Sequence, residues 1–300
     1  MPAPPPSPLC GFLVLDKPAG LTSHDCVGRV RRAYGLRRVG HGGTLDPAVT
    51  GVLPIALGAA TRLLPYLEGD KHYVGAIQLG LRTLSDDLAG ALLAEAPVPP
   101  LTREALEEAL RPFRGSILQR PPQVSAVHVQ GQRAHERVRR GESLELEARP
   151  VRIERLELLG WDPQRARLEL AITCSAGTYI RALARDLGEN LGCGGCLAEL
   201  RRTCALGFSL AQAVPLERLG EEPLPPLLDP LAALPHLPRR QLNEEERALW
   251  RCGRALADGE AAQPAGQAVA VLGPDGNLAG IARADGGGLL QPKLVFDAAG

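Results

Sequence analysis

Crowded prolines divide the 300-residue chain into two unequal parts. Seven of its 27 prolines lie between residues 215 and 240, and each proline fixes its own φ and lacks the N–H group that helices and sheets require. A stretch of this kind interrupts regular structure. We therefore interpret 215–240 as a linker between a large domain over 11–214 and a small domain over 241–300. The Pro-rich residues 1–10 are expected to be disordered.

Apolar runs in the large domain predict strands and helices that follow one another irregularly. Strands are expected where apolar residues run together or alternate, and helices where a polar cap precedes a 3.6-residue period. The expected strands are Gly11–Leu15, Tyr73–Leu79, Val124–Gln130 and Leu168–Cys174, and the expected helices begin near Ser23, Thr102 and Thr178. Because no regular βαβ period is present, we predict an α+β fold around a mixed or mostly antiparallel sheet.

The end of the chain is predicted to form a small β-rich domain. Its apolar runs are short and are separated by Gly, Asp and Pro turns, which is typical of strands in a sheet. These runs are Ala268–Leu272, Leu278–Ala282 and Leu294–Phe296. A domain of this size is modest, and a larger partner beside it makes it viable.

Composition excludes several classes of protein. Hydrophobic residues make up 45% of the chain, which suffices for a packed core. No run approaches the roughly 18 apolar residues of a membrane helix, and the amino terminus lacks a secretion signal, so we expect a cytoplasmic protein without a membrane partner. The seven scattered cysteines favour reduced thiols. Only Cys193 and Cys196 have metal-like spacing, and no metal is expected because no second pair accompanies them.

Basic residues are clustered although the chain is neutral overall, with 34 Lys and Arg against 34 Asp and Glu. Residues 29–38 hold five Arg and no acid, and residues 111–140 hold seven Arg and one acid. Such clusters indicate a localised anion-binding surface that suits a folded RNA, and solvated helix faces are the alternative. Aromatic residues make up only 3% of the chain, which disfavours single-strand recognition by aromatic stacking.

The most informative stretch is the glycine-rich segment Gly40–Gly51, which we interpret as a loop. It lacks the Gly-Lys-Ser/Thr ending of a phosphate-binding loop. Its single carboxylate, Asp46, precedes Pro47, which restricts Asp46 to extended conformations and aims its side chain. Such a carboxylate can act as a nucleophile or a general base, and an ordinary Asp-Pro turn is the alternative. His41, taken alone, is more typical of a loop hydrogen-bonding residue than of a catalyst.

A second stretch, Gly177–Gly188, predicts an amphipathic helix. Helical spacing places Arg181 and Arg185 one turn apart, with an apolar face beside them. An arginine that points inward from the first turn needs a carboxylate partner. A surface arginine or a structural ion pair is the alternative.

Five blocks of sequence resemble, in the same order, those of the TruB family, the tRNA pseudouridine synthases that isomerise the T-loop uridine conventionally numbered 55. The blocks are Gly11–Pro18, Gly40–Gly51, Lys71–Tyr73, Gly177–Gly188, and Leu191–Gly194 with Leu200–Arg202. The resemblance spans roughly residues 11–214 and implies a pseudouridine-synthase-type catalytic domain. A weaker match at the end of the chain implies a PUA-like RNA-binding domain.

The resemblance also implies roles for single residues. Asp46 matches the essential aspartate, and Arg181 matches the arginine that pairs with it. His41, Tyr73, Tyr179 and Leu200 match family positions that contact the flipped uridine or its neighbours. Lys17 matches a family position near the site. The implied reaction requires no cofactor and no metal. Three routes remain open, because Asp46 can attack C1′ of the ribose, attack C6 of the base, or remove the C2′ proton.

The implied partner is the T-arm stem-loop of tRNA, whose backbone the segment 111–140 is expected to hold, and the protein is expected to be a monomer. The chain departs from the family pattern at Gly42, Leu84 or Ser85, Val124 and His128, positions that bear on RNA docking. Two alternatives remain. One is the guide-RNA-dependent synthase of an RNA–protein particle, which resembles the same domain. The other is a tRNA-folding chaperone with a vestigial pocket.

Overall fold

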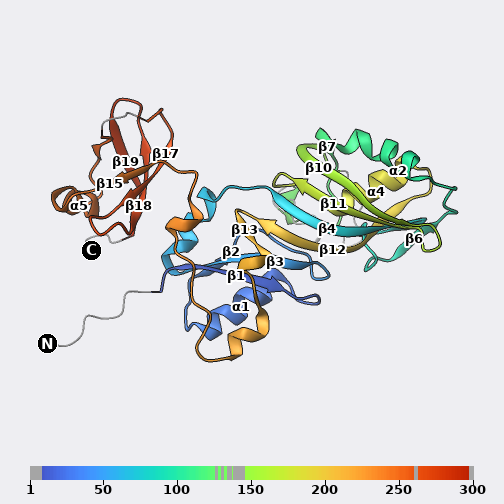
Figure 1. Ribbon diagram of the computed structural model, residues 1–300, viewed down its shortest axis with the longest axis horizontal. Helices are drawn as coiled ribbons and strands as arrows, with labels where there is room; N and C mark the ends of the chain where they lie inside the picture. Colours follow the sequence, from blue (N-terminus) through green and yellow to red (C-terminus); the bar gives the residue numbers. More distant parts are fainter. Residues whose placement is uncertain are drawn as a thin grey trace.

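Two separate sheets organise the protein. The computed structural model describes residues 9–125, 128–129, 132–133, 137, 146–259 and 263–296. Figure 1 shows a long, curved sheet that fills most of the molecule and a smaller sheet at the carboxyl end that lies apart from it. The predicted α+β fold is confirmed, since the large sheet is mixed and helices cover only parts of it.

Among the residues described, the large sheet has ten strands, most of them antiparallel to their neighbours. The parallel pairs are β1 with β14 and β3 with β12. Eight strands form the continuous order β14 (Val214–Pro215), β1 (Gly11–Lys17), β3 (Thr50–Leu57), β12 (Gly195–Ala205), β4 (Lys71–Leu79), β11 (Arg167–Cys174), β10 (Arg149–Asp162) and β7 (Gly115–Gln119). Beside this path, β2 (Val39–His41) pairs with β3 and β13 (Phe208–Ser209) pairs with β12.

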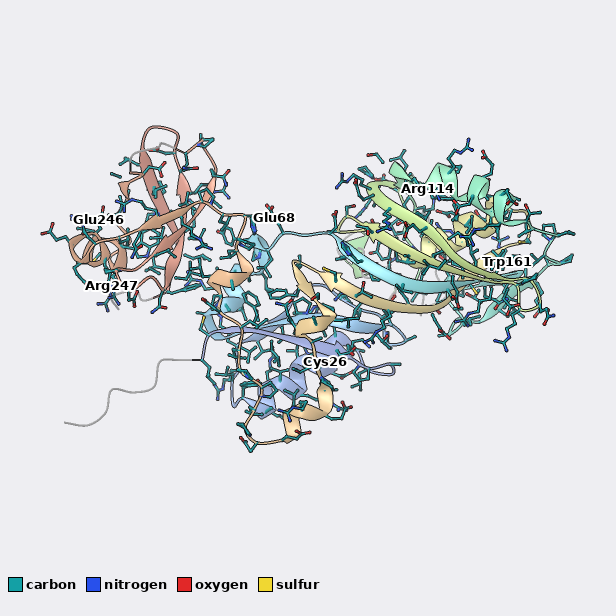
Figure 2. All side chains as sticks on the ribbon, viewed as in Figure 1. Cys26, Glu68, Arg114, Trp161, Glu246 and Arg247 are labelled. Carbon is teal, nitrogen blue, oxygen red and sulfur yellow. The ribbon has the colours of Figure 1, made fainter. Side chains whose placement is uncertain are left out.

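In the described part of the large domain, the helices α1 (Ser23–Ala33), α2 (Arg103–Leu110) and α4 (Ile180–Asn190) pack on the sheet and bury their apolar faces in one core. The helix α1 lies beside β2, and α2 and α4 lie together near β10 and β12. Cys26 of α1, labelled in Figure 2, is fully buried in this core. Thr22 caps α1 through a reciprocal capping box with Asp25, which satisfies the free N–H groups of the first turn. The cap is therefore one residue before the expected Ser23.

Short elements complete the large domain. A hairpin of β5 (Leu81–Thr83) and β6 (Leu92–Glu95) follows β4, and β8 (His128–Val129) pairs with β9 (Gln132–Arg133). The 3₁₀ helices are η1 (Gly58–Tyr66), η2 (Arg111–Phe113) and η3 (Leu210–Gln212). The strand expected over 124–130 is wrong at its start, because Val124 and Ser125 form a bend. Residues 126–127 and 130 of that prediction lie outside the described residues.

The proline-rich segment is an ordered part of the structure. It contains the 3₁₀ helices η4 (Leu216–Gly220) and η5 (Leu231–Ala233). Leu228 exchanges backbone hydrogen bonds with Phe12 of β1, at 3.0 and 2.7 Å, and the Tyr34 hydroxyl donates to the carbonyl oxygen of Pro225 at 2.5 Å. The segment therefore packs along the edge of the large domain while it connects the two sheets.

The carboxyl-terminal sheet has its own core. Its order is β15 (Arg239–Gln241), β17 (Ala268–Leu272), β18 (Leu278–Ala284), β19 (Leu289–Val295) and β16 (Leu256–Ala257). The helix α5 (Glu244–Arg251) buries Trp250 against this sheet. A second apolar cluster joins Ala270 and Ile281 to Phe12 and Leu63 of the large domain. No helix among the residues described is long and apolar enough to cross a membrane.

Candidate active site

The predicted pair of Asp46 and Arg181 forms. Nε of Arg181 lies 2.9 Å from Oδ2 of Asp46. The arginine side chain is 7% exposed and the aspartate side chain is 42% exposed. Arg181 is the second residue of α4, and it is buried, which rules out the alternative of a surface arginine. The pair therefore places a solvent-accessible carboxylate against a buried cation.

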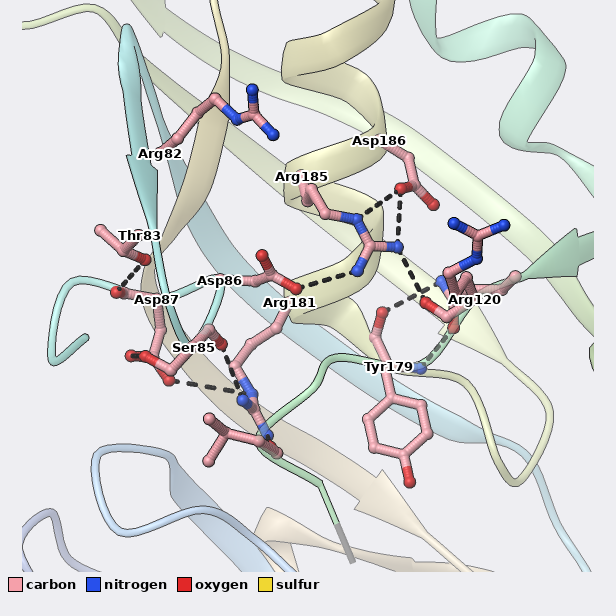
Figure 3. Close-up of polar contacts among 12 residues, drawn as sticks. Arg82, Thr83, Ser85, Asp86, Asp87, Arg120, Tyr179, Arg181, Arg185 and Asp186 are labelled. Carbon is pink, nitrogen blue, oxygen red and sulfur yellow. Dashed lines mark hydrogen bonds and ion pairs between the residues drawn. The ribbon is translucent and has the colours of Figure 1, made fainter. Parts of the chain in front are cut away.

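Every side of the Arg181 guanidinium has a partner. One NH group donates to the carbonyl oxygen of Ser85 at 2.7 Å and the other to that of Val124 at 3.1 Å. Asp87 contributes a second carboxylate, 3.8 Å from Nε. Figure 3 shows these contacts converging on the guanidinium from the turn after β5 and from the chain that follows β7. The cation is thereby fixed in position and orientation before any ligand arrives.

Hydrogen bonds on both sides of Asp46 hold the loop that carries it. Ser23 of α1 accepts from the Leu45 N–H at 2.9 Å and donates to the Leu45 carbonyl at 3.2 Å. Lys17, which is fully buried, donates to the carbonyl oxygens of Pro18 at 2.8 Å and Pro47 at 3.1 Å. Burial lowers the pKa of Lys17. In this structure Lys17 positions the loop through its backbone.

A buried arginine of β12, whose role sequence reasoning missed, binds backbone carbonyl groups on both sides of Asp46. Arg202 donates to the carbonyl oxygens of Val52 at 2.8 Å, Gly43 at 3.1 Å and Thr44 at 3.4 Å. At Gly51, with φ +101°, a Cβ atom would lie 2.1 Å from the Arg202 carbonyl oxygen. Only glycine permits this approach of β3 to β12.

Burial and, to a smaller extent, the nearby charge of Asp46 raise the pKa of both tyrosines, Tyr73 and Tyr179. Tyr73 of β4 is 7% exposed, and burial raises its pKa although Arg202 opposes the shift. Tyr179 precedes α4, and burial raises its pKa as well. The Gln119 amide holds the Tyr179 backbone from both sides, accepting from its N–H at 2.8 Å and donating to its carbonyl at 3.1 Å. Both phenols therefore stay protonated at neutral pH and can donate hydrogen bonds.

His41 and Leu200 lie on strands that border the loop. His41 pairs with Ile55 across β2 and β3, is half-buried, and has its pKa lowered by burial and by Arg202. Its position corrects the expectation of a continuous loop, because β2 extends into Gly40 and His41. Leu200 of β12 lies half-buried against Gly75 of β4.

The remaining candidates from the sequence are the Cys193 and Cys196 pair and the Arg-rich segment 111–140. Cys193 and Cys196 are buried free thiols, and burial raises the pKa of Cys196 to about 11. Among the residues described, no group of three or more side chains has the composition of a metal site. In the Arg-rich segment 111–140, expected to hold RNA, residues 126–127, 130–131, 134–136 and 138–140 lie outside the described residues. Arg111 and Arg114 of the described part form ion pairs with Glu108 and Glu107.

Comparison with solved structures identifies the class of fold. A chain of an H/ACA ribonucleoprotein bound to a substrate RNA containing 2′-deoxyuridine matches with a TM-score of 0.71 and 25% identity, over 95% of this chain and 84% of that chain. A chain of a Cbf5–Nop10–Gar1 complex matches with the same TM-score and 26% identity, over 96% of this chain and 85% of that chain. The fold is that of a pseudouridine synthase.

Sequence comparison then fixes the family. The signature of the TruB family pseudouridylate synthase N-terminal domain matches residues 31–180, and that of the tRNA pseudouridylate synthase B C-terminal domain matches residues 181–228. The tRNA pseudouridine synthases B of Parasynechococcus marenigrum and Synechococcus sp. strain WH7803 are 65% and 59% identical, over 97% of this chain and 98% of theirs. The chain belongs to the TruB family of pseudouridylate synthases.

Proposed function

We propose that this protein isomerises uridine to pseudouridine in the T-loop of tRNA, at the position numbered 55, as a cytoplasmic monomer that needs no cofactor. The observation that carries the proposal is the Asp46 carboxylate, accessible to solvent and held at 2.9 Å by a buried arginine. A protein that only binds RNA has no use for a carboxylate directed at an anionic ligand. Membership of the TruB family supports the same reaction.

The reaction requires little beyond such a carboxylate. The N1–C1′ bond breaks, the uracil turns, C5 bonds to C1′, and the proton lost from C5 is balanced by one gained at N1. Asp46 serves as the nucleophile at C1′ or C6, or as the base that removes the C2′ proton. A buried phenol beside it, Tyr73, stacks on the uracil and relays a proton late in the cycle.

The target base must leave the RNA stack, at a cost of a few kcal/mol. Replacement contacts come from the residues that border the Asp46 loop, which are His41, Tyr179 and Leu200. Lys17 supports the same loop from inside the protein through the carbonyl of Pro47. We assign the carboxyl-terminal sheet to a PUA-like domain that binds the acceptor side of tRNA, and the segment 111–140 to the T-arm backbone.

The relatives favour a stand-alone enzyme over a guide-dependent subunit. The chain covers 98% of the tRNA pseudouridine synthases B that it resembles at 65% and 59% identity. It covers 84% of the H/ACA ribonucleoprotein chain and 85% of the chain from the Cbf5–Nop10–Gar1 complex, at 25% and 26% identity. The intact pair of Asp46 and Arg181 speaks against a chaperone with a vestigial pocket.

The purified full-length protein alone should convert the uridine of an unmodified tRNA, and of an isolated T-arm stem-loop, as detected by a pseudouridine-specific chemical probe. Asp46→Asn should abolish conversion and leave stem-loop binding within a few-fold of wild type. Conversion only in the presence of a guide RNA would favour the ribonucleoprotein alternative. Comparable turnover by the Asp46→Asn variant would remove Asp46 from the chemistry.

A further inference from the structure

A second arginine on α4 lies one turn after Arg181 and is bound in a similar way. NH1 of Arg185 lies 2.9 Å from Oδ2 of Asp86, and its NH2 donates to the carbonyl oxygen of Arg120 at 2.8 Å. Its Nε donates to Oδ1 of Asp186 at 2.8 Å. The side chains of Arg185 and Asp86 are 18% and 13% exposed. The ion pair is therefore largely shielded from water.

Arg181 and Arg185 bridge the same two stretches of chain, as Figure 3 shows. The first stretch is the turn after β5, where Arg181 binds the Ser85 carbonyl and Arg185 binds the Asp86 carboxylate. The second is the segment 120–124, where each arginine binds one carbonyl oxygen. Residues four apart share one face of a helix, so α4 holds both stretches along a single edge.

Asp86 adopts a backbone conformation that depends on such support. Its φ is +59°, in the left-handed region that non-glycine residues seldom occupy. On its other side, the Leu197 N–H of β12 donates to the Asp86 carbonyl at 2.9 Å. The turn is thereby held from α4 and from β12 at the residue next to Ser85, whose carbonyl orients Arg181.

We propose that Asp86 and Arg185 form a positioning pair, which sets the orientation of the Arg181 guanidinium against Asp46. The inference rests on the proposed function, in which Asp46 and Arg181 act on the uridine. Both carbonyl acceptors of Arg181 belong to stretches that Arg185 fixes. A displacement of about 1 Å at a catalytic group can reduce a rate by about 100-fold. The pair therefore acts on turnover through Arg181, without contact to the RNA.

The test measures kcat and KM of the full-length enzyme on the T-arm stem-loop for Arg185→Gln, Asp86→Asn and the double variant. Each single change should lower kcat by about tenfold to 100-fold and leave KM within about threefold. The double variant should be no slower than the slower single variant, because both changes break one interaction. Arg185→Lys keeps the positive charge beside Asp86 and should recover part of the lost kcat.

Arg167→Gln is the matched control. It breaks a 2.7 Å ion pair between Arg167 and Glu199 in the same domain, at the end of β11 away from Tyr73, and its kcat should match wild type. A variant kcat within twofold of wild type, whatever its Tm, would reduce the Asp86–Arg185 pair to a structural ion pair. A change in KM alone, or additive losses in the double variant, would also overturn the proposal.

Two further outcomes separate the possible failures. Asp86→Asn nearly preserves the shape of the side chain, so it carries the test if Arg185→Gln does not fold. An inactive wild-type enzyme on every tRNA substrate would count against the proposed function itself, and active enzyme with unaffected variants would count against the positioning pair alone.

Discussion

The Asp46 loop and helix α4 meet at the site, and buried cations hold both, but the cations bind different kinds of partner. On the loop side, Lys17 and Arg202 donate to backbone carbonyl oxygens. On the helix side, Arg181 and Arg185 bind the carboxylates of Asp46 and Asp86 in addition to backbone carbonyls. The loop side fixes the path of the backbone, and the helix side fixes the orientation of charge.

Because their partners differ, the two sides should respond differently to pH and to substitution. The acceptors on the loop side are carbonyl oxygens, which do not titrate, whereas the acceptors on the helix side include carboxylates, which do. A buried cation that loses carbonyl acceptors, or carbonyls that lose their cation, leaves unsatisfied polar groups that are costly to bury. We therefore expect substitutions on the loop side to act mainly on stability and substitutions on the helix side to act mainly on turnover.

The largest expected effect is that of Arg181→Ala. Removal of the guanidinium leaves Asp46 without the partner that orients it, and loss of a single preorganised group of this kind typically lowers kcat by about 100-fold to 1000-fold. Single-turnover rates on the T-arm stem-loop measure the effect, and filter binding measures the affinity. Loss of affinity with unchanged turnover would place Arg181 on the docking surface, and it would contradict the expectation that the helix side acts mainly on turnover.

Arg202→Met tests the loop side. Three carbonyl oxygens lose their donor, and we expect the free energy of unfolding in urea to fall by about 3 kcal/mol. The neighbouring Arg201→Met is the control, because Arg201 pairs with Asp16 at 2.7 Å with side chains 42% and 32% exposed. An exposed pair of this kind contributes up to about 1 kcal/mol. Equal losses in the two variants would contradict the assigned role of Arg202.

The pair of Asp46 and Arg181 was anticipated from the sequence, and the other contacts around the site were not. Helical spacing placed Arg181 and Arg185 one turn apart and left a surface arginine as an alternative, and the pairing of Arg181 with Asp46 was implied by the resemblance to the TruB family. Arg202 and Gln119 escaped prediction because their partners are backbone groups distant in sequence. A backbone carbonyl leaves no residue type for a sequence pattern to reveal.

The fold shows the same limit at β3. No strand was predicted over residues 50–57, where Pro54 interrupts an apolar run. In the structure, β3 pairs on the side away from β1 with β12 at Thr50–Gly51 and with β2 at Ile55–Leu57. Pro54 lies in the gap between these partners, where the absence of its N–H is tolerated. That gap is a property of the assembled sheet.

The smallest expected effect is the pH dependence of stability that Asp86 produces. Burial raises the Asp86 pKa above its ordinary 3.8 and outweighs the opposing effect of Arg185. Between the pKa of the unfolded chain and the higher pKa of the folded protein, Asp86 is therefore more protonated in the folded protein than in the unfolded chain. The favourable contribution of Asp86 is complete below pH 3.8 and is lost as the pH rises through the folded pKa.

The sign of this effect can be measured against Asp86→Asn, which cannot titrate. Relative to the variant, the wild-type free energy of unfolding should decrease as the pH rises from about 3 to about 6. Asp186, whose pKa burial also raises, shares Arg185 with Asp86 and contributes to the raised Asp86 pKa, so the difference reports the two coupled carboxylates together. A difference that stays flat would mean that Arg185 fully offsets the burial of Asp86. A decrease, together with slower turnover by Asp86→Asn, would show that the Asp86 carboxylate lowers stability at neutral pH while it orients the Arg181 cation. The helix side would then orient charge at a cost in stability, whereas the loop side supports the backbone.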